Sequence, residues 1–452
     1  MHKYEIDMTK GSVFKNIIRF AIPLIFTNVL QLLYNAADTI VVGRWAGTNA
    51  LASVGSTAAL NAFFVNIFVA MSIGASVCVS KCFGAGENEK LERYVHNAII
   101  ISVGAGIISL VAGETFAKFL LQIMGTPDGV VLDGAVLYVR IFFIGVPFAV
   151  LYNFGAAILR AVGDTKRPLY ILSATGIINV VLNLFFVIVF NMGVAGVAAA
   201  TAIANILSAV LVFICLIKTD GAYKFRFKKL IFSKEEFKEI LRIGIPAGIQ
   251  GSVFSLSNMV IQSAVNSFGA EAMAGNTAAA SIGDMVYIAM VSFYHAVITL
   301  VGQNYGVKNK KRIYETVRTA IICVTVLGLF MGWMIIIFAK PLLGIYIKNS
   351  PLAISVGEKR LFVTCSAYFL CGIMEVLSGL LRGMGYSAVP TINSLVGACG
   401  FRIIWVFTVL NSFRTIEVLY LCWPLSWTAV IVLHIITFII IRKKAFSNMY
   451  SR

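Results

Sequence analysis

The residues best able to do chemistry in this sequence are three acids inside long apolar runs: Asp38, Asp284 and Glu375. Where such runs cross a membrane, an ionisable side chain costs at least about 2.5 to 3.5 kcal/mol, and the residue is a candidate for a functional site. Asp38 lies about five residues before the expected outer end of its helix, which is about 8 Å at 1.5 Å per residue. Its carboxylate is the first candidate for an ion-binding group.

Three uncharged polar residues are expected at a depth similar to that of Asp38: Asn179, Asn183 and Thr201. The two asparagines are spaced i, i+4 and therefore share one face of a helix. Oxygen atoms around one carboxylate suit a proton or a small hard cation such as Na+. The amides and the hydroxyl alone could equally be interhelical hydrogen bonds that only hold a bundle together. Asp38 favours the ion site, because such packing does not need a carboxylate.

A second acid site is expected in the other half of the chain. Glu375 lies near the middle of an apolar run, and its counterpart in the internal repeat described below is Asn153, so the two halves differ chemically. Glu375 either handles substrate or ion, or is a buried acid paired with Arg402. Asp284 is a weaker candidate for the same second acid site.

The composition indicates a membrane protein. Of the 452 residues, 59% are apolar and 13% are charged, whereas an ordinary soluble domain has about 45 to 50% apolar and about 25% charged residues. The net charge of +17 would suggest nucleic acid in a soluble protein. In a membrane protein it is expected to encode orientation instead, so we expect no nucleic-acid partner.

Apolar runs bounded by charged residues, Gly and Pro predict twelve membrane-spanning helices. The first six are expected at 16–42, 51–80, 94–121, 135–158, 168–190 and 193–217. The second six are expected at 241–265, 276–303, 315–338, 361–381, 388–410 and 416–441. With a cytoplasmic N-terminus, 28 of the 37 Lys and Arg residues fall inside, seven outside and two within helices. This excess predicts a multi-pass protein of the plasma (inner) membrane with both termini cytoplasmic.

A shift of 222 residues superimposes the two halves of the sequence. The sequence LRAVG at 159–163 meets LRGMG at 381–385, and Pro168 meets Pro390. Each half then holds six spans in the same orientation, which predicts two six-helix lobes related by a pseudo-twofold axis along the membrane normal. The predicted fold is an all-α integral membrane protein of twelve transmembrane helices. Its expected parts are an N-lobe (1–217), a cytoplasmic linker (218–240) and a C-lobe (241–452).

Several kinds of chemistry lack the residues they need. The eight cysteines show no CxxC and no His at ligand spacing, as is typical of packed thiols. His96, His295 and His434 have no mutual spacing and are interpreted as packing residues rather than proton relays. There is no glycine-rich phosphate-binding motif, no catalytic constellation and no cleavable signal peptide. We therefore expect neither an enzyme nor a cofactor, and any work must draw on an energy source other than nucleotide.

Several segments together resemble the multidrug and toxic compound extrusion (MATE) family. They are IPLIFTNVLQLLYNAADTIVVGRWAG, ILRAVGDTKRP, INVVLNLFF followed by GVAGVAAATAIA, VGQNYG and SGLLRGMGYSAVP. The resemblance covers nearly the whole chain. It implies a twelve-helix, two-lobe efflux carrier, driven by Na+ or H+, that exports cationic amphipathic compounds by alternating access.

The resemblance also assigns roles to single positions. The family's first-span acid falls on Asp38. Prokaryotic members with an N-lobe cation site carry an Asn, an acid and a Thr at the positions of Asn179, Asn183 and Thr201. This chain has Asn183 where the acid is expected, so its N-lobe site, where Na+ could bind, holds one carboxylate. The acid that another branch carries on the seventh span is also missing.

Our interpretation is an antiporter in which Asp38 binds H+ or Na+ from outside and the ion competes with the drug. Gln31, Tyr34 and Asn35 precede Asp38 and are expected to line a substrate cleft, where aromatic rings would attract a flat cation. The expected partners are small cationic or amphipathic molecules and membrane lipids, and the protein is expected to be a monomer.

The closest alternative is a flippase for lipid-linked oligosaccharide or polysaccharide with a similar two-lobe build. Such a carrier would be expected to line its cleft with Arg and Lys, whereas only Arg140 and Arg402 are intramembrane here. An ion channel or receptor would not need a two-lobe repeat, and no filter-like sequence is repeated.

Overall fold

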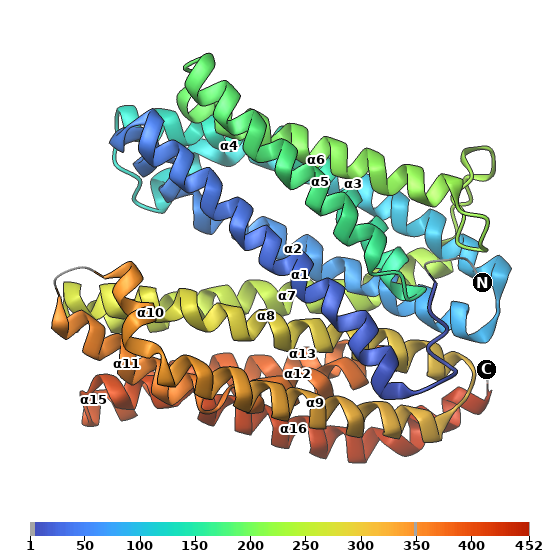
Figure 1. Ribbon diagram of the computed structural model, residues 1–452. Helices are drawn as coiled ribbons and strands as arrows, with labels where there is room; N and C mark the ends of the chain where they lie inside the picture. Colours follow the sequence, from blue (N-terminus) through green and yellow to red (C-terminus); the bar gives the residue numbers. More distant parts are fainter. Residues whose placement is uncertain (1–4, 348–349, 452) are drawn as a thin grey trace. The chain divides into compact units, whose positions relative to one another are not determined.

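The computed structural model describes residues 5–347 and 350–451, and the described chain is built from helices (Figure 1). Lys3, Lys348 and Arg452, counted above among the basic residues of the two sides, lie outside the described residues. The first half contains α1 (Val13–Val41), η1 (Val42–Ala46), α2 (Thr48–Ala85), α3 (Asn88–Ile123), α4 (Val130–Ala161), α5 (Lys166–Leu184), η2 (Phe185–Val189), α6 (Gly193–Lys218) and η3 (Phe227–Lys229). The second half contains α7 (Lys234–Asn266), α8 (Ala270–Gly306), α9 (Lys310–Ile337), α10 (Ala339–Tyr346), α11 (Pro351–Cys365), α12 (Tyr368–Gly383), α13 (Ala388–Ser394), η4 (Leu395–Gly400), α14 (Phe401–Phe407), α15 (Val409–Ser412) and α16 (Ile416–Ser451).

Each of the twelve expected spans coincides with a helix or with helices in succession. Within the described residues, ten helices are long and apolar enough to cross a membrane, and the bent pair α11 and α12 makes an eleventh. The exception is the seventh expected span, 241–265, which is helical in α7 but is not among these helices. The reason is that polar residues crowd its second half, including Gln250, Asn258 and Gln262.

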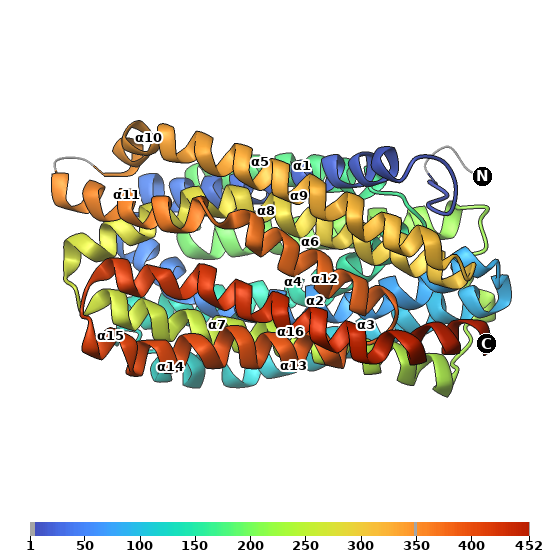
Figure 2. The same cartoon turned by 90° about the horizontal axis from the view of Figure 1, so that it is seen from below.

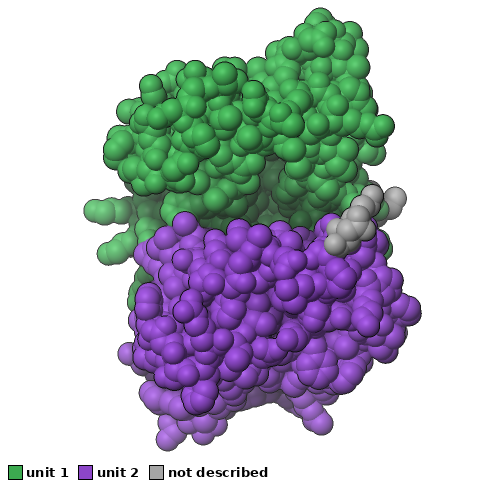
Figure 3. All heavy atoms as spheres, turned by 90° about the vertical axis from the view of Figure 1, so that its left-hand side faces the viewer, with its two compact units in different colours: residues 1–7, 26–248 green, residues 8–25, 249–452 purple. Residues whose placement is uncertain are grey.

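The helices form two compact units, whose borders differ from the predicted lobes (Figure 3). The first unit comprises residues 1–7 and 26–248, and the second comprises residues 8–25 and 249–452. The borders therefore fall inside α1 and α7, shortly after Pro23 and Pro246. The predicted lobes kept both helices whole, because repeat matching assigns entire spans to one half.

Within each unit the long helices lie side by side (Figures 1 and 2). In the first unit α4 packs against α2, α3 and α6. In the second unit α12 packs against α8, α9 and α16, which are the repeat counterparts of α2, α3 and α6. The same arrangement of partners in both units agrees with the internal repeat read from the sequence.

The residues just before α1 are fixed within the second unit by polar contacts to α8 and α9. The Met8 amide donates to Gln303 Oε1 at 2.9 Å, and Asn304 Nδ2 donates to the Met8 carbonyl at 3.2 Å. The Arg312 guanidinium donates to the carbonyl groups of Met8, Lys10 and Gly11 at 2.7 to 3.0 Å. These contacts explain why residues 8–25 belong to this unit.

The motif GDTKR forms the turn between α4 and α5. Asp164 is fully buried, and its Oδ1 accepts the backbone amides of Lys166 and Arg167 at 3.1 Å each, which satisfies two free donors at the start of α5. Burial raises the pKa of Asp164, while the ion pair with Arg167 opposes that rise. Arg167 also donates to the Tyr223 hydroxyl at 3.0 Å, so the turn is tied to the linker.

The first half of α7 approaches α2 so closely that two glycines are required. A Cβ atom on Gly74 would lie 2.3 Å from the Ile240 carbonyl oxygen, and one on Gly244 would lie 2.5 Å from the Met71 carbonyl oxygen. Because both neighbours are backbone atoms, neither can move away without shifting a helix.

Replacing Gly74 or Gly244 by Ala should therefore destabilise the purified protein by about 1–3 kcal/mol, the usual cost of overpacking. Thermal unfolding in detergent measures this as a lower melting temperature. Gly104→Ala on α3 is the matched control, because no atom lies within 4 Å of a Cβ added there. If Gly74→Ala and Gly104→Ala melted at the same temperature, the close contact of α2 and α7 would be refuted.

Candidate functional site

The structure brings together the four residues predicted to form the ion site. They come from three helices of the first unit: Asp38 from α1, Asn179 and Asn183 from α5, and Thr201 from α6. Asn183 Nδ2 donates to Asp38 Oδ1 and, at 3.3 Å, to Asn179 Oδ1. Asn179 Nδ2 in turn donates to Thr201 Oγ1 at 3.5 Å. The result is a chain of hydrogen bonds that begins at the carboxylate.

Burial of this cluster limits the ways in which its oxygen atoms can be satisfied. Asn183 is fully buried and Asn179 is nearly so, while Asp38 is half-buried. The Asn183 Oδ1 atom accepts no hydrogen bond from any residue that the structure describes. The Thr201 hydroxyl donates to the Val197 carbonyl of its own helix at 3.0 Å, which leaves its oxygen facing the cluster as an acceptor.

The donor set of the cluster fits a small hard cation or a proton. It offers a carboxylate, an amide oxygen without a partner and a hydroxyl oxygen, and hard cations prefer ligands of this kind. Within the described residues, no three His, Cys, Asp or Glu side chains are grouped so that they could hold a metal ion. The cluster therefore relies on amide and hydroxyl oxygens beside its one carboxylate.

Two neighbours of the cluster were missed in the sequence. Tyr138 on α4 lies close enough to Asp38 for the two groups to interact electrostatically. Gly176 on α5 lies against the Tyr34 ring, because a Cβ added there would lie 1.8 Å from a ring carbon. A glycine inside a helical run can indicate such a close approach, and this signal was available at Gly176.

The three residues expected to line a substrate cleft lie on α1 of the first unit and differ in their surroundings. The Tyr34 hydroxyl donates to the Ser173 carbonyl at 3.2 Å, so this side chain is packed on α5. Gln31 and Asn35 are exposed. The structure does not join Gln31 or Asn35 to the hydrogen bonds around Asp38.

The second acid site lies in the second unit, and the pairing of Glu375 with Arg402 is wrong. Arg402 is buried, donates to Ser426 Oγ at 3.0 Å and lies about equally far from the Phe254 and Trp423 rings, at 5.9 and 6.0 Å. It forms no ion pair with Glu375. Two aromatic faces and one hydroxyl satisfy this cation, so a carboxylate partner is not needed.

Glu375 and Asp284 instead interact with other arginines. Glu375, half-buried on α12, interacts electrostatically with Arg382. Arg382 is buried and donates to the Tyr294 hydroxyl and to Gln250 Oε1, both at 2.6 Å. The expected span 361–381 ended just before Arg382, so Arg382 was not predicted to be part of a site. In the structure it lies in the last turn of α12. Asp284 is exposed on α8 and interacts with Arg360.

The chain is similar to known proteins over most of its length. A family model described as MatE matches residues 23–185 and 246–408, once in each half of the chain. The probable multidrug resistance protein YpnP of Bacillus subtilis is 30% identical over 412 residues, which cover 90% of each protein. The probable multidrug resistance protein NorM of Thermotoga maritima is 26% identical over 409 residues. The match covers 88% of this chain and 86% of the Thermotoga protein.

Two solved structures have the same fold. One, described as the outward-facing conformation of a multidrug resistance MATE family transporter, is 22% identical, matches over 100% of both chains and has a TM-score of 0.88. The other, a transporter of Pyrococcus furiosus described by a binding pocket of reverse polarity, is 23% identical and also has a TM-score of 0.88, with 100% and 99% of the chains covered. Both solved structures are described as transporters. With both halves matched and a relative at 30% identity, the chain belongs to the multidrug and toxic compound extrusion family of membrane transporters.

Proposed function

We propose that the protein is a secondary active antiporter that exports cationic amphipathic compounds in exchange for H+ or Na+. The observation that carries the proposal is the Asp38 carboxylate held by Asn183 beside an amide oxygen that has no partner. Relatives named as multidrug resistance proteins support export of such compounds over the flippase alternative.

The ion acts at Asp38 because an ionised carboxylate in apolar surroundings needs a partner. A proton removes the charge, and Na+ balances it with help from the oxygens of Asn183 and Thr201. The ion can drive alternating access only through a difference in its affinity for the two states. Since α1 belongs to one unit at Asp38 and to the other before residue 26, a change at Asp38 acts on a helix that both units share.

One carboxylate limits the stoichiometry of coupling. At the position where family members carry a second acid, Asn183 contributes a neutral amide that donates to Asp38. We infer that binding of H+ and of Na+ at Asp38 is mutually exclusive and that one positive charge is exchanged there per cycle. No cofactor takes part.

The remaining candidate residues act on the substrate. Glu375 supplies negative charge for a cationic compound, and Asp284 adds to it, while Gln31, Tyr34 and Asn35 on α1 form part of the substrate path. The protein works as a monomer in the plasma (inner) membrane. Both termini are cytoplasmic, because basic residues concentrate on that side.

Asp38→Asn should abolish export, because the amide neither takes up a proton nor balances Na+. Ethidium efflux from proteoliposomes under separately imposed Na+ and pH gradients measures this, and the gradient that drives the unmodified protein identifies the coupling ion. The exposed loop residue Asp128 provides the control Asp128→Asn, which should transport normally. Undiminished export by folded Asp38→Asn protein would refute the assignment of the ion site.

Asn183→Asp should strengthen cation binding, because two contacting carboxylates cannot both stay ionised without a cation or proton. The Na+ concentration that half-saturates thermal stabilisation, with choline chloride holding the ionic strength, should fall roughly tenfold. Asn153→Asp adds the same charge on α4, where the Asn153 amide donates to the Ala149 carbonyl of its own helix at 2.9 Å. Identical Na+ curves for Asn183→Asp and the unmodified protein would contradict a cation site at this position.

Glu375→Gln should weaken binding of a cationic substrate by roughly tenfold, about 1.4 kcal/mol, while leaving the ion dependence unchanged. The measurement is the KM for ethidium efflux at a saturating ion gradient. Glu417→Gln is the control, because Glu417 is a surface acid paired with Lys359 at 2.5 Å. An unchanged KM would remove Glu375 from substrate binding.

A further inference from the structure

The segment that joins α6 to α7 has an unusual composition. Between Asp220 and Glu235 it carries five basic residues and no acid, together with aromatic and aliphatic side chains in the sequence YKFRFKKLIF. It follows directly on the end of one spanning helix, α6, and leads into α7. The segment therefore lies where the spanning helices leave the apolar layer.

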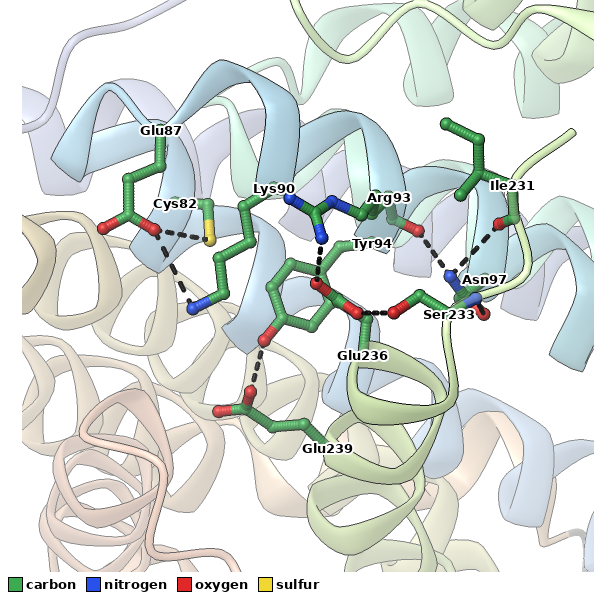
Figure 4. Close-up of polar contacts among 10 residues, drawn as sticks. All are labelled: Cys82, Glu87, Lys90, Arg93, Tyr94, Asn97, Ile231, Ser233, Glu236 and Glu239. Carbon is green, nitrogen blue, oxygen red and sulfur yellow. Dashed lines mark hydrogen bonds and ion pairs between the residues drawn. The ribbon is translucent and has the colours of Figure 1, made fainter. Parts of the chain in front are cut away.

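Two buried side chains of α3 fix the base of this segment. The backbone amides of Arg226 and Ile231 point at the two ring nitrogens of His96, each at 3.3 Å. Asn97 makes two hydrogen bonds to the segment through its side-chain amide. Its Nδ2 donates to the Ile231 carbonyl at 3.4 Å, and its Oδ1 accepts the Ser233 amide at 3.2 Å (Figure 4). His96 and Asn97 are fully buried. The segment between 226 and 233 is thus a loop held at both ends.

The start of α7 is fixed by the same part of α3. The Ser233 hydroxyl donates to Glu236, and Glu236 lies 3.7 Å from the Arg93 guanidinium (Figure 4). One turn further, the Tyr94 hydroxyl donates to Glu239. The loop therefore projects from a base that is rigidly bonded to the first unit.

Side chains in the segment that joins α6 to α7 separate into buried and exposed sets. Tyr223 and Phe225 point inward, and the Phe225 ring packs against His96 with 4.9 Å between ring centroids. Phe227, Leu230 and Phe232 are exposed by 66%, 58% and 61%. The fixed base thus leaves these three large apolar side chains mostly exposed.

Basic side chains lie among these exposed apolar groups. Lys228 and Lys234 are exposed and form no ion pair with any described residue. Arg226 is about half exposed and lies 3.6 Å from Glu92. An exposed loop with apolar and basic groups, and with no acid in its own sequence, complements an anionic headgroup layer above acyl chains.

We propose that the loop 226–233, together with Lys234 at the start of α7, docks on the anionic phospholipid surface of the membrane leaflet at this end of the helices. Phe227, Leu230 and Phe232 insert at the boundary of headgroups and acyl chains, and Lys228 and Lys234 contact the phosphates. The hydrogen bonds to His96 and Asn97 hold the loop in shape beforehand, so docking orders few further residues. The proposal depends on the spanning fold alone and not on the transport reaction.

A single tryptophan placed in the loop tests the docking. Phe232→Trp is reconstituted in vesicles of phosphatidylcholine, with or without phosphatidylglycerol, whose acyl chains carry bromine. The difference in tryptophan emission between this variant and the unmodified protein comes from residue 232. This difference should be quenched by about half where phosphatidylglycerol is present. Asp220→Trp is the control, because Asp220 belongs to the same segment but lies outside the loop and is 80% exposed. Its added emission should be quenched little.

The basic residues are tested in the same protein. Adding Lys228→Gln and Lys234→Gln to Phe232→Trp should remove the dependence of quenching on phosphatidylglycerol, as should high salt. The proposal would be overturned if the emission of Phe232→Trp stayed unquenched in both kinds of vesicle. It would also be overturned if the quenching were the same with and without phosphatidylglycerol and with and without the two Lys substitutions. Phe227→Trp should repeat the result and keeps the test valid if Phe232→Trp does not fold.

Discussion

One constraint shapes the first unit: an acid on an apolar helix has to be satisfied by its neighbours. The carboxylate of Asp38 can be kept in a largely apolar bundle only when donors reach it. Asn183 supplies the donor, and Asn179 and Thr201 orient Asn183 in turn. Each of these residues has to stay on its face of its helix, so α1, α5 and α6 are fixed relative to one another by the needs of one charged group.

The helix that carries this acid is also one of two helices shared by both units. Met8, Lys10 and Gly11 are bonded to Gln303, Asn304 and Arg312, whereas the second half of α1 packs on α5 through Tyr34. The first half of α7 is held by α2 and α3 in the corresponding way. In each repeat, therefore, the beginning of the first helix belongs to the other unit. Because α1 is one continuous helix, a change in the ion bound at Asp38 is covalently linked to both units.

Much of this could be predicted from the sequence, because hydropathy and an i, i+4 spacing are local properties. They located the spans and brought Asn179, Asn183, Thr201 and Asp38 to one depth. The unit borders inside α1 and α7 could not be predicted, since they depend on contacts between residues far apart in the chain. For the same reason the pairing of Arg402 was wrong: the rings of Phe254 and Trp423 approach it only in the folded unit.

The two units solve the problem of buried charge in different ways, and this difference follows from single substitutions between the repeats. The first unit holds a carboxylate with amides and has the neutral Asn153 at the position that corresponds to Glu375. The second unit holds the guanidinium of Arg382 with Tyr294 and Gln250, and an acid lies within electrostatic reach of it. An acid beside an arginine is already partly balanced, whereas Asp38 has only neutral neighbours among its hydrogen-bond partners. The need for an added cation or proton is therefore greatest at Asp38, which makes the first unit the stronger candidate for ion coupling.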